Sequence, residues 1–392
     1  MEQPAAVSEV FGNGDLFDQI LLRLDNPVFL VLASRVDKTW RRRATDRDFL
    51  GRFRNHLARR PRPRPLGFYV SFFSYENPFD CTKFVQMSQP PKLADVTSSA
   101  FFGNFGDNLD PGEQSHVVHC RNGRVLLNLY RRCDGPYAVL GPLDTAPAVA
   151  RLPPLPPSPV VSDIGFRFLA DHGRDGPLCL FICISSSTDM VRLPRLQDQD
   201  GQWVDSISCA TGLSATLGDP GCQFLARDEN LYMLSSNGYI VRLDLTSMSF
   251  LVMGLPDGVQ LDGCDTEEAE DKQILSRAYD DFGVYFIQIK GLHLRVWVCK
   301  SDGDNAGTWM LEANISLPKA FGHLAKKPED WRYGLLRLLS AGDNADFVFL
   351  VDGSEIYRHI FYLDIKTRSV EEVYCRLNED RELLDSCHFM MT

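Results

Sequence analysis

The sequence lacks the features of membrane-spanning and exported proteins. It has no run of about 18 uncharged apolar residues, which a membrane-spanning helix requires. Residues 1–10 are polar and carry Glu2 and Glu9, so they do not resemble a secretory signal. The 11 cysteines follow no regular spacing, which favours reduced thiols over a disulfide framework. We therefore expect an intracellular protein of the cytoplasm or nucleus, with no membrane partner.

Motifs that carry catalytic or metal chemistry are also missing. The chain has no Gly-x-Ser-x-Gly elbow, no phosphate-binding glycine loop and no His-Glu-x-x-His pair. Zinc sites usually take cysteine and histidine at short, paired spacings. The nearest approach, His116, His119 and Cys120 with Cys133, has no second pair, and the acidic stretch 262–271 lacks the spacing of a calcium loop. The sequence thus predicts no catalytic residue, no metal site and no cofactor.

The chain does contain enough apolar material for a large core, and its charge is uneven. Of its 392 residues 44% are hydrophobic and 24% are charged, a globular composition. Residues 1–65 carry 13 basic and 8 acidic side chains, although the net charge of the whole chain is −11. A small basic segment therefore precedes a large acidic body. The acidic body, and the lack of a stacking platform of aromatic residues among the basic ones, argue against nucleic acid as a partner.

The segment 12–57 has the periodicity of helices. Asn13 and Asn26 can cap helix N-termini, and Pro27 suits a first helical position. A third helix is expected to begin at Thr45, with Asp48 placed as in a capping box. Apolar residues recur at helical spacing in three groups: Leu16, Phe17, Ile20, Leu21 and Leu24; Phe29, Leu32, Ala33, Val36 and Trp40; and Phe49, Leu50, Phe53 and Leu57. Three helices of about ten residues cannot bury all of these faces among themselves, so we expect another polypeptide to cover part of them.

The segment 58–65 separates the helices from the rest of the chain. Arginine alternates with proline from Arg59 to Pro65, a pattern that forms neither helix nor sheet ladder. Such a segment favours an extended, self-repelling spacer. We therefore place a linker at 58–65, between a helical domain at 12–57 and a second domain at 66–392.

The second domain has the pattern of short strands separated by turns rich in Gly, Asp, Asn and Pro. It contains a weak internal repeat. Residues 239–247 and 359–367 both have the pattern of a strand that ends in Leu-Asp-(Leu/Ile) and is followed by a polar turn. Residues 137–144 are a third version of this pattern. Candidate hairpins recur every 40–50 residues or so, roughly the length of a four-stranded blade. We predict an all-β propeller, because radial repetition protects the edges of the sheets. The spacing of the hairpins predicts six blades, with seven as the alternative.

The helical segment resembles the F-box. The resemblance rests on 15–24 (Asp-Leu-Phe-Asp-Gln-Ile-Leu-Leu-Arg-Leu), 36–41 (Val-Asp-Lys-Thr-Trp-Arg) and 46–49 (Asp-Arg-Asp-Phe), whose spacing follows the family pattern. Gly12-Asn13 stands where the family has Leu-Pro, Asp25 where it has Pro, and Asp37 where it has Cys. The segments 65–69 (Pro-Leu-Gly-Phe-Tyr) and 120–127 (Cys-Arg-Asn-Gly-Arg-Val-Leu-Leu) resemble large plant F-box families, especially those of grasses. In those families an F-box-associated β-propeller follows the F-box.

The resemblance implies a non-catalytic adaptor. Its F-box would dock on a Skp-type adaptor, and through it on a cullin scaffold of a ubiquitin ligase, while the propeller would bind the protein to be ubiquitinated. The target and the propeller loops that bind it are not identified. The residues implied to face the adaptor are Leu16, Ile20, Leu21, Leu24, Leu30, Val36 and Trp40. The alternative is a propeller that binds proteins outside any ligase and carries a degenerate F-box; the departures at Gly12, Asn13 and Asp37 keep this alternative open.

Overall fold

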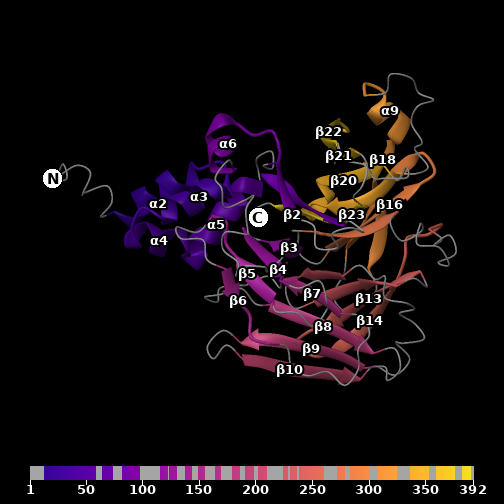
Figure 1. The fold of residues 1–392 in the computed structure, drawn as a ribbon, viewed down its shortest axis with the longest axis horizontal. Helices are drawn as coiled ribbons and strands as arrows, with labels where there is room; N and C mark the ends of the chain where they lie inside the picture. The colour runs from indigo at the N-terminus through magenta and orange to yellow at the C-terminus, as the bar shows by residue number, and fades with distance from the viewer. Residues whose placement is uncertain are drawn as a thin grey trace.

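The computed structural model contains a group of helices beside a body of antiparallel sheets (Figure 1). It describes residues 13–58, 64–73, 82–97, 115–121, 123–129, 137–143, 149–154, 164–168, 179–185, 190–197, 202–209, 224–227, 230–235, 238–259, 272–278, 283–300, 307–324, 336–352, 359–375 and 382–389.

Four short helices follow one another at the N-terminal side: α2 (Gly14–Leu22), α3 (Pro27–Ser34), α4 (Lys38–Ala44) and α5 (Arg47–Ala58). The caps predicted for the first two are confirmed. The side-chain oxygen of Asn13 accepts a hydrogen bond from the backbone N–H of Asp15 at 3.0 Å, and that of Asn26 accepts one from Val28 at 2.9 Å. No helix in the described part of the chain has the length and apolar character needed to cross a membrane.

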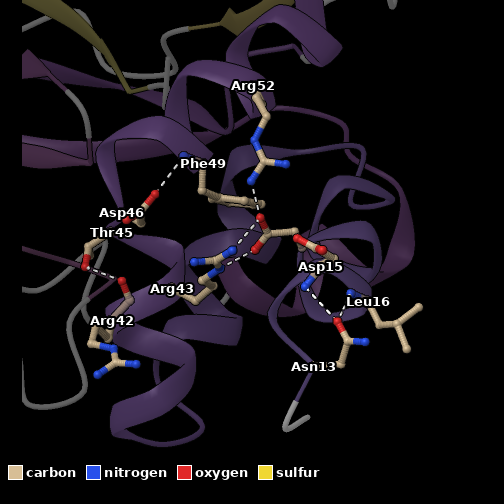
Figure 2. A network of polar contacts seen from close by, with 10 residues as sticks. Asn13, Asp15, Leu16, Arg42, Arg43, Thr45, Asp46, Phe49 and Arg52 are labelled. Carbon is tan, nitrogen blue, oxygen red and sulfur yellow. Dashed lines mark hydrogen bonds and ion pairs between the residues drawn. The ribbon is translucent and has the colours of Figure 1, made fainter. Parts of the chain in front are cut away.

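The boundaries of the later helices differ from those predicted. Asp37 interrupts the expected second helix, because its carboxylate accepts hydrogen bonds from the N–H groups of Thr39 (2.6 Å) and Trp40 (3.0 Å) and so begins α4. Asp46, rather than Thr45, caps α5, since its carboxylate accepts from the N–H of Phe49 at 2.9 Å (Figure 2). The Thr45 hydroxyl instead donates to carbonyl oxygens of α4. The expected three helices are therefore four.

The body consists, in its described residues, of one three-stranded and five four-stranded antiparallel sheets. The three-stranded sheet has the order β2 (Thr82–Gln86), β1 (Gly67–Phe73), β23 (Glu382–Phe389). The other sheets are β3 (His116–Arg121), β4 (Arg124–Asn128), β5 (Tyr137–Leu140) and β6 (Val149–Arg151); β7 (Ile164–Phe168), β8 (Cys179–Ser185), β9 (Met190–Gln197) and β10 (Gln202–Cys209); β11 (Phe224–Arg227), β12 (Asn230–Leu234), β13 (Tyr239–Asp244) and β14 (Ser249–Gly254); β15 (Gln273–Arg277), β16 (Gly283–Lys290), β17 (His293–Lys300) and β18 (Thr308–Ser316); and β19 (Leu336–Ala341), β20 (Phe347–Asp352), β21 (His359–Asp364) and β22 (Val370–Cys375). Two further helices, α6 (Pro91–Thr97) and α9 (Leu317–Phe321), follow β2 and β18.

One strand of each sheet takes part in a closed circle of contacts. β3 contacts β7, which contacts β11, and the series continues through β15, β19 and β23 back to β3. Neighbouring sheets pack face to face through apolar side chains, for example Phe286 of β16 with Tyr232 of β12, and Phe68 of β1 with Phe349 of β20. Sheets stacked radially around a common centre define a β-propeller, which confirms the predicted fold of this domain.

The two ends of the body are joined in one sheet. β23, the last strand of the described chain, pairs antiparallel with β1, so that Gly67 lies opposite Phe389 and Ser71 opposite Asp385. β1 in turn pairs with β2 on its other side. Because the sheet combines strands from both ends of the domain, it closes the circle and leaves no unpaired first and last sheet.

The internal repeat seen in the sequence corresponds to two similar hairpins, β13–β14 and β21–β22. At the start of each turn an aspartate, Asp244 or Asp364, accepts a hydrogen bond from the backbone N–H three residues further along, at 2.9 and 2.7 Å. Four residues after each aspartate the backbone is left-handed, at Met248 (φ 54°) and Arg368 (φ 60°). The third version begins with β5, but its aspartate, Asp144, lies outside the described residues.

We predict that Gly67→Ala destabilises the closing sheet. A Cβ atom at Gly67 would overlap the ring of Phe84 and the carbonyl oxygen of Val85, whereas one at Gly254 meets nothing within 4 Å. Overpacking should lower the free energy of unfolding by about 1–3 kcal/mol in the Gly67 variant, and Gly254→Ala, its control, should change it little. Urea unfolding measures both. Equal effects of the two substitutions would contradict the tight packing described.

Candidate protein-binding surface of the helical domain

The four N-terminal helices enclose a small core of their own. Six apolar residues are buried together in it and come from all four helices: Phe17, Leu21, Leu30, Ala44, Phe49 and Phe53. Trp40 packs its ring edge-to-face on Phe17, with centroids 4.8 Å apart. Leu24 is partly buried against the same cluster. The helices therefore bury more of their apolar surface than their length led us to expect.

A buried carboxylate ties three of these helices together. The side chain of Asp18 on α2 is only 1% exposed and forms ion pairs with Arg43 on α4 and Arg52 on α5. Figure 2 shows the two guanidinium groups converging from different helices. Burial disfavours the charged form of Asp18, but the hydrogen bonds from both arginines outweigh it and hold the pKa of this carboxyl below its ordinary value. The same contact raises the pKa of Arg43.

Helix α3 packs against the propeller as well as against the helical core. Val28 is buried with residues of the body that include Leu66, Tyr69 and Val117, and Phe29 and Leu32 lie against the same cluster. Part of the helical apolar surface that we expected another polypeptide to cover is thus covered by the chain itself. For α3, the covering surface is the propeller and not a separate partner.

The end of the predicted spacer is also held by the propeller. The guanidinium of Arg64 donates a hydrogen bond to Glu371 on β22 at 2.6 Å and lies over the ring of Tyr362, 4.7 Å from its centroid. The side chain of Gln89 donates to the backbone carbonyl of Pro65 at 2.5 Å. The segment 59–63 lies outside the described residues. The last residues of the linker are therefore fixed to the body.

The seven residues predicted to face an adaptor fall into three groups. Leu16 (43% exposed) and Ile20 (38%) lie one turn apart on α2, and Val36 (64%) lies after α3. Leu21 and Leu30 are buried in the helical core, where a partner cannot reach them in this conformation. Leu24 and Trp40 are half-buried. Because Leu16 and Ile20 share a face of α2, we call them the α2 patch.

The departures from the F-box pattern have a local explanation in two places. Asn13 caps α2 and Asp37 caps α4, so each polar residue satisfies N–H groups at a helix start. A cap of this kind contributes about 1 kcal/mol to helix stability. Asp25 is exposed between α2 and α3, and Gly12 lies outside the described residues. The substitutions at Asn13 and Asp37 thus leave the apolar core of the helices intact.

The docking of α3 on the propeller was not predicted, although the sequence carries a signal for it. The segment 27–34 (Pro-Val-Phe-Leu-Val-Leu-Ala-Ser) is apolar on nearly every side, and a helix of that kind is buried all round. Cys133, one of the residues of the group around His116 that we did not predict to be a zinc site, lies outside the described residues. In the described part of the chain one group of metal-ligating side chains does come together, at His359, Glu372 and Cys375, and none of these was a predicted site residue.

The fold and this surface define a two-part protein, in which a small helical domain is docked on a β-propeller. The family model for "F-box protein AT5G49610-like, beta-propeller" matches residues 116–392. The chain belongs to this family. The matched range begins at β3 and does not include helices α2 to α5.

Solved structures give only distant similarities. The β-propeller domain of Cps50 (Swd1) from Myceliophthora thermophila is 12% identical, with a TM-score of 0.37, over 70% of this chain and 88% of that one. TolB from Acinetobacter baumannii is 10% identical, with a TM-score of 0.41, over 83% and 67%. A functionally unknown protein from Desulfotomaculum acetoxidans is 12% identical, with a TM-score of 0.41, over 82% and 99%. No curated protein matches the chain significantly.

We predict that Asp18→Asn destabilises the chain in a pH-dependent way. Because the pKa of Asp18 is lowered in the folded protein, its contribution is fully present above the ordinary carboxyl pKa and is lost as the pH falls through the folded value. At pH 7 the variant should lose about 1–3 kcal/mol of unfolding free energy. Below about pH 4 the difference from the wild type should shrink.

Urea unfolding at a series of pH values, followed by the helical circular dichroism signal, measures this difference. Asp25→Asn is the control, because Asp25 is exposed and lies between helices. Its effect should stay within about 0.5 kcal/mol at every pH. A difference between wild type and Asp18→Asn that does not change with pH would count against the ionised carboxylate as the stabilising group.

Proposed function

We propose that the protein is the substrate-recruiting subunit of a Skp–cullin–F-box ubiquitin ligase, and that its helical domain is the F-box. The observation that supports this proposal most is the α2 patch, two large apolar side chains that stay exposed on a helix whose other apolar residues are buried or partly buried. Figure 1 shows α2 on the side of the helical domain away from the sheets. Exposed apolar residues that share one helix face suit a protein partner. Membership of a family named for its F-box proteins supports the same function.

In this proposal the two sides of the helical domain have different partners. The α2 patch, together with Val36, binds the Skp-type adaptor, and α3 binds the propeller of the same chain. The propeller binds the target protein through loops that we do not assign. The subunit itself catalyses no reaction. It raises the effective concentration of a target lysine near the ubiquitin-charged enzyme of the assembly.

We further infer a propeller of six blades in a protein of the cytoplasm or nucleus. The six sheets and the circle of contacts through β3, β7, β11, β15, β19 and β23 support this number. The blade closed by β23 then contains strands from both ends of the domain. The proposed compartments are those in which a ubiquitin ligase subunit would meet its adaptor.

We predict that Ile20→Asp weakens adaptor binding without unfolding the chain. A carboxylate at this position would have to lose its water in the interface, which should weaken binding about tenfold or more. Leu292→Asp is the matched control, because Leu292 is an exposed leucine (49%) in the turn between β16 and β17 of the propeller. Calorimetric titration of the full chain with a purified Skp-type adaptor measures both. Equal weakening by the two substitutions would overturn the α2 patch as the binding surface.

A wild-type chain that is folded and does not bind the adaptor would favour the alternative, a protein-binding propeller with a degenerate F-box. The triple variant Gly12→Leu, Asn13→Pro and Asp37→Cys then restores the family residues. If the alternative is correct, this variant should gain binding that the natural chain lacks. If neither chain binds, the helical domain is not an F-box.

A further inference from the structure

The hairpin β21–β22 brings three metal-ligating side chains together at the outer edge of its sheet. His359 lies directly opposite Cys375, and Phe361 lies opposite Glu372. Residues three apart on a regular strand point to opposite faces, so Glu372 and Cys375 would normally be separated. The register shifts between Ile360 and Phe361, which inserts one extra residue between Glu372 and Cys375. This bulge places both side chains on the face that His359 occupies.

The spacing of the three groups suits a metal ion. One ligand atom from each of His359, Glu372 and Cys375 lies within 4.8 Å of the others. The Nδ1 atom of His359 is 3.4 Å from a carboxylate oxygen of Glu372. Charge-assisted hydrogen bonds are shorter, at about 2.7–2.9 Å. Two nitrogen or oxygen ligands on a tetrahedral zinc ion, each about 2.0–2.1 Å from the metal, lie about 3.3 Å apart. The observed separation therefore fits two ligands of one ion better than a direct ion pair.

The imidazole of His359 has an unsatisfied nitrogen directed at this group. Its Nδ1 atom is screened from solvent and has no hydrogen-bond partner. The ring is stacked on Phe361, with centroids 6.1 Å apart and an angle of 18° between the planes. A polar atom that is buried without a partner is uncommon in proteins, and a bound ion is one of its recognised explanations. The ring is thus positioned by packing, with its Nδ1 atom facing the carboxylate.

We propose that His359, Glu372 and Cys375 bind a zinc ion, and that water occupies the fourth position. Imidazole and thiolate ligands favour zinc, whereas magnesium and calcium take oxygen ligands. Glu372 and Cys375 are exposed, so the ion can enter from solvent. When the ion binds, the thiol of Cys375 becomes a thiolate and releases its proton to solvent. The site is independent of the ligase function proposed above.

The site would stabilise the part of the propeller that holds the linker. Glu372 is adjacent to Glu371, which accepts the hydrogen bond from Arg64. Among the described strands, β22 pairs only with β21 and so lies at the edge of its sheet. An ion bound to both strands would fix the end of this hairpin and hence the anchor of the linker.

The test uses the full chain, stripped of metal with a chelator and titrated with Zn²⁺ by calorimetry and with Co²⁺ by absorption spectroscopy. Tetrahedral Co²⁺ with a thiolate ligand gives a sulfur-to-metal charge-transfer band and strong visible bands. Cys375→Ser should remove the charge-transfer band of one equivalent of Co²⁺. His359→Gln and Glu372→Gln should each weaken Zn²⁺ binding about tenfold or more. Mg²⁺ should give no binding heat at this site.

Glu371→Gln is the matched control, since it changes the neighbouring carboxylate, which faces Arg64, and should leave Zn²⁺ affinity unchanged. The chain has 11 cysteines, so the difference between wild type and Cys375→Ser is the measured quantity. Circular dichroism without metal shows whether each variant is folded; exposed Glu372 and Cys375 should tolerate substitution. Co²⁺ bands that are the same in wild type and Cys375→Ser, or equal affinities in the Glu371 and Glu372 variants, would overturn the proposal.

Discussion

The arrangement of this protein depends on the burial of one short helix. Helix α3 is apolar on nearly all sides, and no single neighbour can cover it. Leu30 packs into the helical core while Val28 packs into the propeller, so the helix belongs to two hydrophobic cores at once. Burying one such side chain contributes about 1.5–3 kcal/mol, and separating the domains would expose several of them to water. The position of the helices on the propeller therefore follows from the hydrophobic effect acting on residues 27–34.

Local chemistry could be predicted from the sequence, and long-range packing could not. The caps Asn13 and Asn26 and the paired hairpins at Asp244 and Asp364 depend on residues within four positions of one another, so their patterns are visible in one stretch of chain. The propeller followed from repetition of such stretches. Asp37 was missed as a cap because the apolar spacing around it continued through the helix break, and Asp46 was missed because its neighbour Thr45 has the capping-box spacing to Asp48.

The candidate sites also depend on long-range packing that the sequence does not reveal. Exposure of Leu16 and Ile20 and burial of Leu21 depend on which face of α2 meets α5, and spacing along one helix does not decide this. His359 and Cys375 are far apart in sequence and become neighbours only through the register of two strands, and Glu372 joins them only through a bulge. A motif search for paired cysteines and histidines cannot find ligands that a hairpin brings together. The partners of Asp18 on α4 and α5 are hidden for the same reason.

The contact between Arg64 and the β21–β22 hairpin has a mechanical consequence. Helix α3 lies in a core shared with the propeller, and Glu371 and Tyr362 hold the end of the linker. These contacts join the helices and the propeller into one unit. A partner that binds the helices would therefore also fix the orientation of the propeller. In the ligase function proposed above, this fixed orientation would determine which surface of a bound target protein faces the ubiquitin-charged enzyme.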